Sequence, residues 1–175
     1  LRSQIAYVSA EVPLIRGSLR KNLCYGAGPV EPERLDRILT ECGLDELRAQ
    51  LRGGLDAKLA EGGASLSQGE RMRVALARAL LRGPRILILD EADANLDQRA
   101  RQALDHNIAG FPGTVLMASH RQSSLKNCDT LWNLNEGRLQ NCTSLSPDTK
   151  VVPLVVGKTA GNVASIQVSQ VQGCA

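Results

Sequence analysis

The feature that most constrains the fold is a continuous aliphatic run, Arg85-Ile-Leu-Ile-Leu-Asp90, followed at once by Glu91. A run without polar alternation is typical of a strand that is covered on both faces in a parallel sheet. A helical pattern around Gln98 to Ile108 and a second aliphatic segment, Thr114 to Ala118, come next. Strand, helix and strand in this order predict right-handed crossovers onto a parallel sheet, and therefore an α/β fold.

Most of the first half of the chain has helical character instead. Apolar residues recur at helical spacing after Pro32, and Glu70 to Arg82 form a strongly helical segment. That segment stops at Gly83-Pro84, because glycine favours a left-handed cap and proline cannot continue a helix. Only Ile5 to Ala10, short and β-branched, indicates another buried strand in this half.

These patterns predict one partial domain with a helical insertion. Beyond Asn141 the periodicity is lost, so the rest of the chain is treated as a tail of unknown structure. The predicted units are a domain over residues 1–140, in which 11–83 form the helical subdomain and 1–10 with 84–140 form the sheet core, and a tail over 141–175.

Composition limits the classes of partner. Aromatic residues are 2% of the 175, so base-stacking platforms are not expected, and a net charge of +3 with interspersed signs favours no nucleic acid. No apolar run approaches the roughly 18 residues of a membrane-spanning helix. Five scattered cysteines without a Cys-x-x-Cys spacing are expected to be reduced thiols that bind no metal. The chain opens without a methionine, so we expect a cut N-terminus.

Asp90 and Glu91 are the first candidates for chemistry. Phosphoryl transfer at the edge of a parallel sheet needs a metal-holding carboxylate at the carboxyl end of a strand. Asp90 would hold Mg²⁺, usually through water, and Glu91 would accept a proton from the attacking water. Many α/β domains also end a strand in an acidic helix cap, so the pair alone leaves both interpretations open.

A second candidate, Leu66-Ser-Gln-Gly-Glu70, stands at the start of the strongly helical segment. Ser67 and the backbone amides near Gly69 would lie at a helix N-terminus, where N–H groups and the helix dipole attract a phosphate group. Ser67-x-x-Glu70 is also an ordinary capping box. Both interpretations are compatible, because a phosphate-binding helix terminus must still be capped when it is empty.

In their order along the chain, these motifs resemble those of the ATP-binding cassette (ABC) transporter family. Leu66 to Glu70 resembles the signature motif, Arg85 to Glu91 the Walker B strand, and Ala94-Asn-Leu-Asp97 the D-loop. His120 follows the next strand, where the family places a switch histidine that bonds the γ-phosphate. The resemblance covers residues 1 to about 140. It implies a P-loop NTPase-like parallel sheet with an inserted α-helical signature subdomain.

The resemblance also implies a function that uses ATP and Mg²⁺. Two cassettes would face each other head to tail and move a transmembrane domain, in the same or a partner chain, from the cytoplasmic face of a membrane. The segments Glu61-Gly62-Gly63 and Pro13 to Leu23 favour an exporter. The implied site residues are Asp90 (Mg²⁺), Glu91 and His120 in one site, Ser67, Gln68 and Gly69 in the partner's site, and Asp97 in the D-loop.

The chain departs from the family pattern at three places. Ala10 stands at the Q-loop position, where a glutamine would reach Mg²⁺, and only Glu11 beside it could substitute. Gln68 replaces a glycine of the signature motif and Glu70 replaces a glutamine, and we expect both to be tolerated because Ser67 and Gly69 remain. No G-x-x-x-x-G-K-S/T precedes the signature, so the Walker A loop is expected to lie outside this chain, which alone should be inactive. Gly157-Lys158-Thr159 is rejected as that loop, since its first glycine would be Val152.

Two other functions stay open beside transport. In a regulatory cassette, Ala10 would leave the site silent and ATP would only hold the dimer together; Glu91 and His120 argue against this. A soluble cassette working on DNA or ribosomes would carry long charged heptads before the signature, and about sixty ordinary residues stand there instead. An unrelated α/β domain with coincidental motifs is the remaining interpretation. The transported substrate and the identity of the partner cassette do not follow from the sequence.

Overall fold

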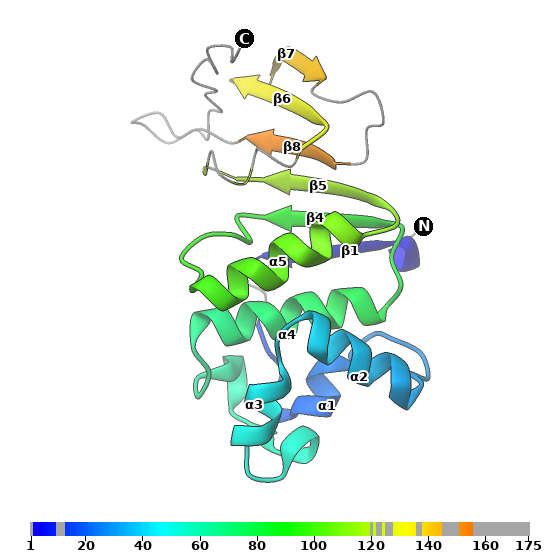
Figure 1. Ribbon diagram of the computed structural model, residues 1–175, viewed down its shortest axis with the longest axis vertical. Helices are drawn as coiled ribbons and strands as arrows, with labels where there is room; N and C mark the ends of the chain where they lie inside the picture. The colour runs from blue at the N-terminus through cyan, green and yellow to red at the C-terminus, as the bar shows by residue number, and fades with distance from the viewer. Residues whose placement is uncertain are drawn as a thin grey trace.

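The computed structural model describes residues 2–9, 13–119, 121, 124, 128–135, 138–144 and 151–155. A sheet occupies one end of the molecule and a block of helices the other (Figure 1). The strands are β1 (Ile5–Ser9), β2 (Gly17–Ser18), β3 (Lys58–Leu59), β4 (Ile86–Asp90), β5 (Thr114–Ala118), β6 (Thr130–Asn135), β7 (Arg138–Ser144) and β8 (Val151–Val155). The α-helices are α1 (Leu19–Leu23), α2 (Pro32–Glu41), α3 (Asp45–Gln50), α4 (Gln68–Leu81) and α5 (Gln98–Gly110).

The main sheet has the order β1-β4-β5-β8-β6-β7. All neighbouring strands are parallel except the antiparallel pair of β6 and β7. The α/β fold with a parallel sheet that the sequence predicts is therefore confirmed. Ser9 pairs with Asp90, and Asp90 with Ala118, so these three strands end together at one edge of the sheet.

The sheet includes residues that sequence analysis placed in a tail of unknown structure. Residues 141–144 complete β7, and Val151–Val155 form β8 between β5 and β6. Pro153 explains why the sequence does not predict this strand, since proline inside an apolar run argues against a strand with neighbours on both sides. Gly157-Lys158-Thr159 and the rest of the chain beyond β8 lie outside the described residues.

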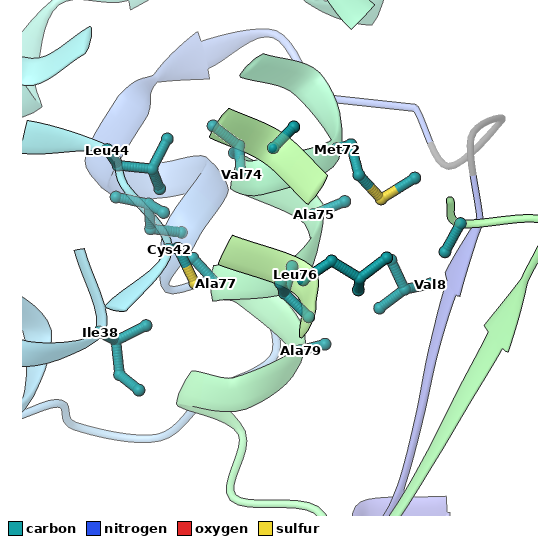
Figure 2. Packing of buried hydrophobic residues seen from close by; sticks show 14 of the residues in the cluster. Val8, Ile38, Cys42, Leu44, Met72, Val74, Ala75, Leu76, Ala77 and Ala79 are labelled. Atoms are coloured by element: carbon teal, nitrogen blue, oxygen red, sulfur yellow. The ribbon is translucent and has the colours of Figure 1, made fainter. Parts of the chain in front are cut away.

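Helix α4 is the centre of the hydrophobic core. It packs against β1 on one side and against α1 and α2 on the other, and most of its residues are buried. Figure 2 shows Val8 of β1 beside Leu76, while Ile38 and Leu44 lie on the opposite side of α4. Leu76 is 1% exposed, and truncating such a side chain to alanine costs about 2–5 kcal/mol. Helix α4 thus joins the sheet to the helical block, and α5 adds further contacts to α2.

The predicted helical subdomain is also present, with one addition. Helices α1 to α3 fill the segment after β1, but β2 and β3 form a short antiparallel pair among them. In the part of the chain that the structure describes, none of the helices has the length and apolar character needed to cross a bilayer.

Candidate active site

The carboxyl edge of β4 carries the predicted acidic pair. Asp90 ends the strand, and the Glu91 N–H donates to the Ala118 carbonyl oxygen at 3.0 Å, which ties the turn to the end of β5. Glu91 has φ of 48°, a left-handed conformation that side chains rarely adopt, so the chain turns sharply here. Such backbone positions persist only where their surroundings fix them. The backbone that carries both carboxylates is therefore fixed at the sheet edge.

Tyr7 is a residue of this edge that sequence reasoning missed. Its hydroxyl donates to Asp90 Oδ2 at 2.7 Å, although the side chain is 51% exposed. Tyr7 and Asp90 are 83 positions apart, and they meet only because β1 and β4 are neighbours. The contact holds one oxygen of Asp90 in place at the sheet edge.

Asp90 can serve as one ligand of an octahedral cation whose other ligands are mostly water molecules and phosphate oxygens. Among the described residues, no group of three or more His, Cys, Asp or Glu side chains gathers around a common point. An all-protein metal cage is therefore absent from this part of the chain. Mg²⁺ is commonly held by one or two carboxylates together with substrate phosphates, and a single strand-end carboxylate fits that donor set.

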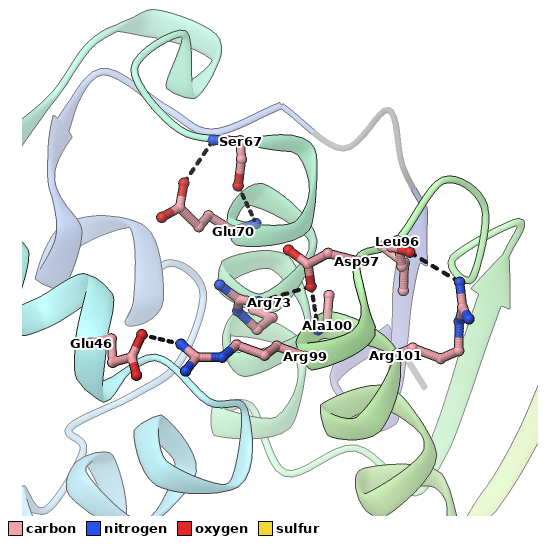
Figure 3. A network of polar contacts seen from close by, with 9 residues as sticks. All are labelled: Glu46, Ser67, Glu70, Arg73, Leu96, Asp97, Arg99, Ala100 and Arg101. Atoms are coloured by element: carbon pink, nitrogen blue, oxygen red, sulfur yellow. Dashed lines mark hydrogen bonds and ion pairs between the residues drawn. The ribbon is translucent and has the colours of Figure 1, made fainter.

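The N-terminus of α4 is closed by a complete capping box (Figure 3). The Glu70 N–H donates to Ser67 Oγ at 3.2 Å, and the Ser67 N–H donates to Glu70 Oε2 at 2.7 Å. The capping interpretation of this motif is confirmed. Gln68 and Gly69 occupy the first two positions of the helix, where backbone N–H groups point outward along its axis.

Gly69 lies against the start of the next helix rather than in open space. A Cβ atom on Gly69 would meet Asp97 Oδ2 at 2.6 Å. Asp97 is the N-cap of α5 and accepts from the Ala100 N–H at 2.7 Å, and Arg73 Nη1 donates to the same carboxylate oxygen at 3.4 Å (Figure 3). The signature-like helix and the D-loop-like aspartate are therefore in contact within one chain. Arg73, 7% exposed, is a further residue that sequence reasoning missed.

A second aspartate in the same loop makes a different set of contacts. Asp93 Oδ2 accepts from Ser119 Oγ at 2.6 Å and from Ser124 Oγ. Arg121 Nη1 donates to the Asp93 carbonyl oxygen at 3.4 Å. No motif in the sequence marks this cluster, which joins the turn after β4 to the residues after β5.

Arg78 connects α4 to the segment around α1. Its guanidinium donates to the Asn22 carbonyl and side-chain oxygens, each at 2.8 Å, and to the Pro13 carbonyl oxygen at 3.2 Å. Burial lowers the pKa of Arg78, with the Tyr25 ring opposing this shift. Asn22, fully buried, also bonds both backbone groups of Ile15. The segment from Pro13 to Leu23 is thus held on the signature-like helix by a polar network.

Two predicted site residues cannot be placed. Ala10, at the Q-loop position, and His120 both lie outside the described residues. Ser119 and Arg121, which flank His120 in sequence, are described and belong to the Asp93 cluster. Asp90, Glu91, Ser67, Gln68, Gly69 and Asp97 all lie in described elements or turns.

The parallel sheet, the acidic strand end and the capped helix form an α/β domain of the kind found in P-loop NTPases. The family model "ABC transporter" matches residues 1–94, more than half of the chain. The chain therefore belongs to the ABC transporter family and corresponds to part of its ATP-binding domain.

Three similar proteins support this assignment. The chain is 36% identical to P-glycoprotein 14 of Caenorhabditis elegans over 142 residues, 80% of this chain and 11% of that protein. It is 36% identical to antigen peptide transporter 2 of Homo sapiens over 146 residues, 83% of this chain and 21% of that protein. The structure of a bacterial Atm1-family ABC exporter with ATP bound superposes with a TM-score of 0.75 at 32% identity, covering 82% of this chain and 25% of that chain. The chain thus spans a quarter or less of these proteins.

Proposed function

We propose that this chain is part of a nucleotide-binding domain that couples ATP binding and hydrolysis to export across a membrane. The observation that carries the proposal is the position of Asp90 and Glu91 at the carboxyl edge of a parallel sheet, with a capped signature-like helix in the same chain. Similarity to the bacterial Atm1-family ABC exporter, solved with ATP bound, supports the direction of transport.

Each residue of the proposed site has a separate task. Asp90 would hold Mg²⁺, with the Tyr7 hydroxyl restraining one carboxylate oxygen. Mg²⁺ supplies charge neutralisation on the transferred phosphate when it is bound. Glu91 would take a proton from the attacking water, and the sharp turn fixes where its carboxylate emerges. His120 would bond the γ-phosphate as it does in the family.

The signature-like helix would serve the site of a second cassette. Ser67, Gln68 and Gly69 form its N-terminal end, where the helix dipole and backbone N–H groups favour an anion. Two such domains, facing head to tail at the cytoplasmic side of the membrane, would close on ATP and open after hydrolysis. The Arg78 to Asn22 network would pass this motion to the segment of Pro13 to Leu23 and then to a transmembrane domain.

The test is ATP turnover by the full-length polypeptide that contains this domain, reconstituted in lipid, with Glu91→Gln as the variant. Turnover should fall by about 100-fold or more, since a positioned general base contributes 10²–10⁴-fold. The matched control is Glu33→Gln, which changes an exposed glutamate of α2 and should leave turnover unchanged. Retained turnover in Glu91→Gln would remove Glu91 from the proposed role.

One observation favours a second function, a regulatory cassette that binds ATP and rarely hydrolyses it. Ala10 has no side chain that could reach a metal or orient water. In that case the same experiment would show bound nucleotide and negligible turnover in both the unmodified protein and Glu91→Gln. We further propose that residues 1–175 alone neither bind ATP tightly nor hydrolyse it. Equilibrium binding of a fluorescent ATP analogue, compared with the full-length polypeptide, tests this.

A further inference from the structure

The turn after β4 contains a buried carboxylate to which the proposed site assigns no task. Asp93 is 3% exposed and follows Glu91 by two positions. A buried carboxylate is costly unless it is hydrogen-bonded, so its partners indicate what it is for. The hydrogen-bond partners of Asp93 therefore indicate what holds the turn that carries Glu91.

The side-chain partners of Asp93 come from one segment of the chain. Ser119 Oγ donates to Asp93 Oδ2 at 2.6 Å, and Ser124 Oγ donates to the same oxygen. Arg121 adds a bond from its Nη1 to the Asp93 carbonyl oxygen at 3.4 Å. Ser119 is fully buried, so water does not compete for its hydroxyl. Charged hydrogen bonds in such surroundings are roughly twice as strong as neutral ones.

The described residues of this segment also bond to one another. Ser119 Oγ accepts from the Arg121 N–H at 3.0 Å, and the Ser124 N–H donates to the Arg121 carbonyl oxygen at 3.1 Å. The Ser119 hydroxyl therefore bridges Asp93 and the backbone of Arg121. Its two bonds hold both sequence neighbours of His120.

Backbone hydrogen bonds at Glu91 add a second point of contact between the turn after β4 and the end of β5. The Glu91 N–H donates to the Ala118 carbonyl oxygen at 3.0 Å, and the Ala94 N–H donates to the Glu91 carbonyl oxygen at 3.0 Å. The turn of residues 91–94 and the segment of residues 118–124 are thus joined at two points, at Glu91 through the backbone and at Asp93 through the side chain. Two such points restrict both the distance and the relative rotation of the segments.

We propose that Asp93 is a positioning residue for ATP hydrolysis, which holds Ser119, Arg121 and Ser124 in a fixed relation to the turn that carries Glu91. This inference rests on the proposed function, because Glu91 and His120 act in hydrolysis only under that proposal. Displacement of a catalytic group by about 1 Å can cost 100-fold in rate. The carboxylate therefore influences turnover although it does not touch the nucleotide.

The experiment compares Asp93→Ala with Asp93→Asn in the full-length polypeptide. Both hydroxyls bond a single oxygen of Asp93, so the amide oxygen of asparagine can accept both. We expect Asp93→Ala to lower kcat about tenfold with KM for ATP changed less than about twofold, and Asp93→Asn to recover most of the loss. Asp56→Ala, which removes an exposed carboxylate in the helical block, is the matched control and should leave kcat unchanged.

Amide hydrogen exchange, measured without nucleotide, gives a readout independent of activity. Asp93→Ala should accelerate exchange in peptides covering 118–128, while exchange in α2 and α4 stays unchanged, and Asp93→Asn should remain close to the unmodified protein. If Asp93→Ala does not fold, Ser124→Ala removes one donor and should show the same local acceleration with a loss in kcat of about threefold.

Three results would overturn the proposal. They are unchanged exchange in 118–128, an Asp93→Asn variant no better than Asp93→Ala, or a loss of activity that equals the fraction unfolded. Failure of the proposed function would look different, because Glu91→Gln would then retain turnover while the exchange data still report whether Asp93 holds the segment.

Discussion

Two aspartates four positions apart hold the same loop to two different parts of the molecule. In what we call the helix junction, Asp97 joins Gly69 and Arg73 of α4 to the start of α5. In the strand junction, Asp93 joins Ser119, Arg121 and Ser124 to the turn after β4. The Asp97 side chain is 54% exposed, whereas Asp93 is 3% exposed.

The difference in burial determines which interaction contributes most to stability at each junction. Around Asp97 water screens the charge, so the ion pair with Arg73 contributes little and the close approach of Gly69 is the sensitive contact. Around Asp93 water is excluded and the hydroxyl donors are the sensitive contacts, because a buried acceptor that loses them bears the full desolvation cost. One loop is therefore held by packing on one side and by polar contacts on the other.

The largest expected effect is at the helix junction, in Gly69→Ala. The new Cβ would lie 2.6 Å from Asp97 Oδ2 and 3.4 Å from Ala100 Cβ, so either the Asp97 carboxylate must leave its capping position or the two helices must separate. We expect the free energy of unfolding to fall by about 1–3 kcal/mol, as in other overpacked sites. Urea denaturation measures this. Gly110→Ala is the control, since nothing lies within 4 Å of a Cβ there, and equal stability of the two variants would show that the contact is not tight.

A smaller effect is expected when the carboxylate of the helix junction is removed. Asp97→Ala removes the N-cap of α5 and should destabilise the protein by about 1 kcal/mol. Asp97→Asn keeps an oxygen that accepts from the Ala100 N–H and loses only the charge facing Arg73. It should therefore lower the free energy of unfolding by at most a few tenths of a kcal/mol. Thermal unfolding at low and high salt separates the two contributions. If asparagine costs as much as alanine, the ion pair and not the cap holds this junction.

Local patterns predicted the ends of single elements better than the contacts between elements. The capping box at Ser67 and Glu70 and the strand ending in Asp90 depend on residues a few positions apart, so the sequence alone indicates both. The contact of Asp93 with Ser119 joins positions 26 apart, and it follows from β4 and β5 being adjacent strands.

The other omissions have the same physical origin. Tyr7 reaches Asp90 only through the pairing of β1 with β4, and the need for glycine at position 69 appears only once α5 is packed against α4. For β8 the local signal was misleading, because Pro153 lies within the strand. Order along the chain predicts which motifs belong to the proposed site, and only tertiary packing shows what holds them in place.

Two buried thiols, one near each junction, can show whether the junctions open separately. Cys128 donates to the Ser124 carbonyl oxygen at 3.4 Å beside the strand junction, while Cys42 lies next to Asn107 of α5 and close enough to Arg73 for its charge to be felt. Burial raises the pKa of each thiol from 9.0 to about 12. Both should therefore be unreactive toward iodoacetamide at pH 8 in the folded protein, because the thiolate is the nucleophile.

The smallest expected effect is the loss of stability that these thiols cause at pH 9. An unfolded thiol ionises near 9 and a folded one near 12, so the stability they contribute is complete below pH 9 and is lost as the pH rises toward 12. At pH 9 the loss is about 0.4 kcal/mol for each thiol, and Cys42→Ala should remove the loss that belongs to Cys42.

Alkylation followed by mass spectrometry at pH 8 tests whether the two junctions open separately. Asp93→Ala should expose Cys128 faster than Cys42, and Gly69→Ala should do the reverse, whereas equal rates in both variants would mean that the loop releases α4 and β5 together.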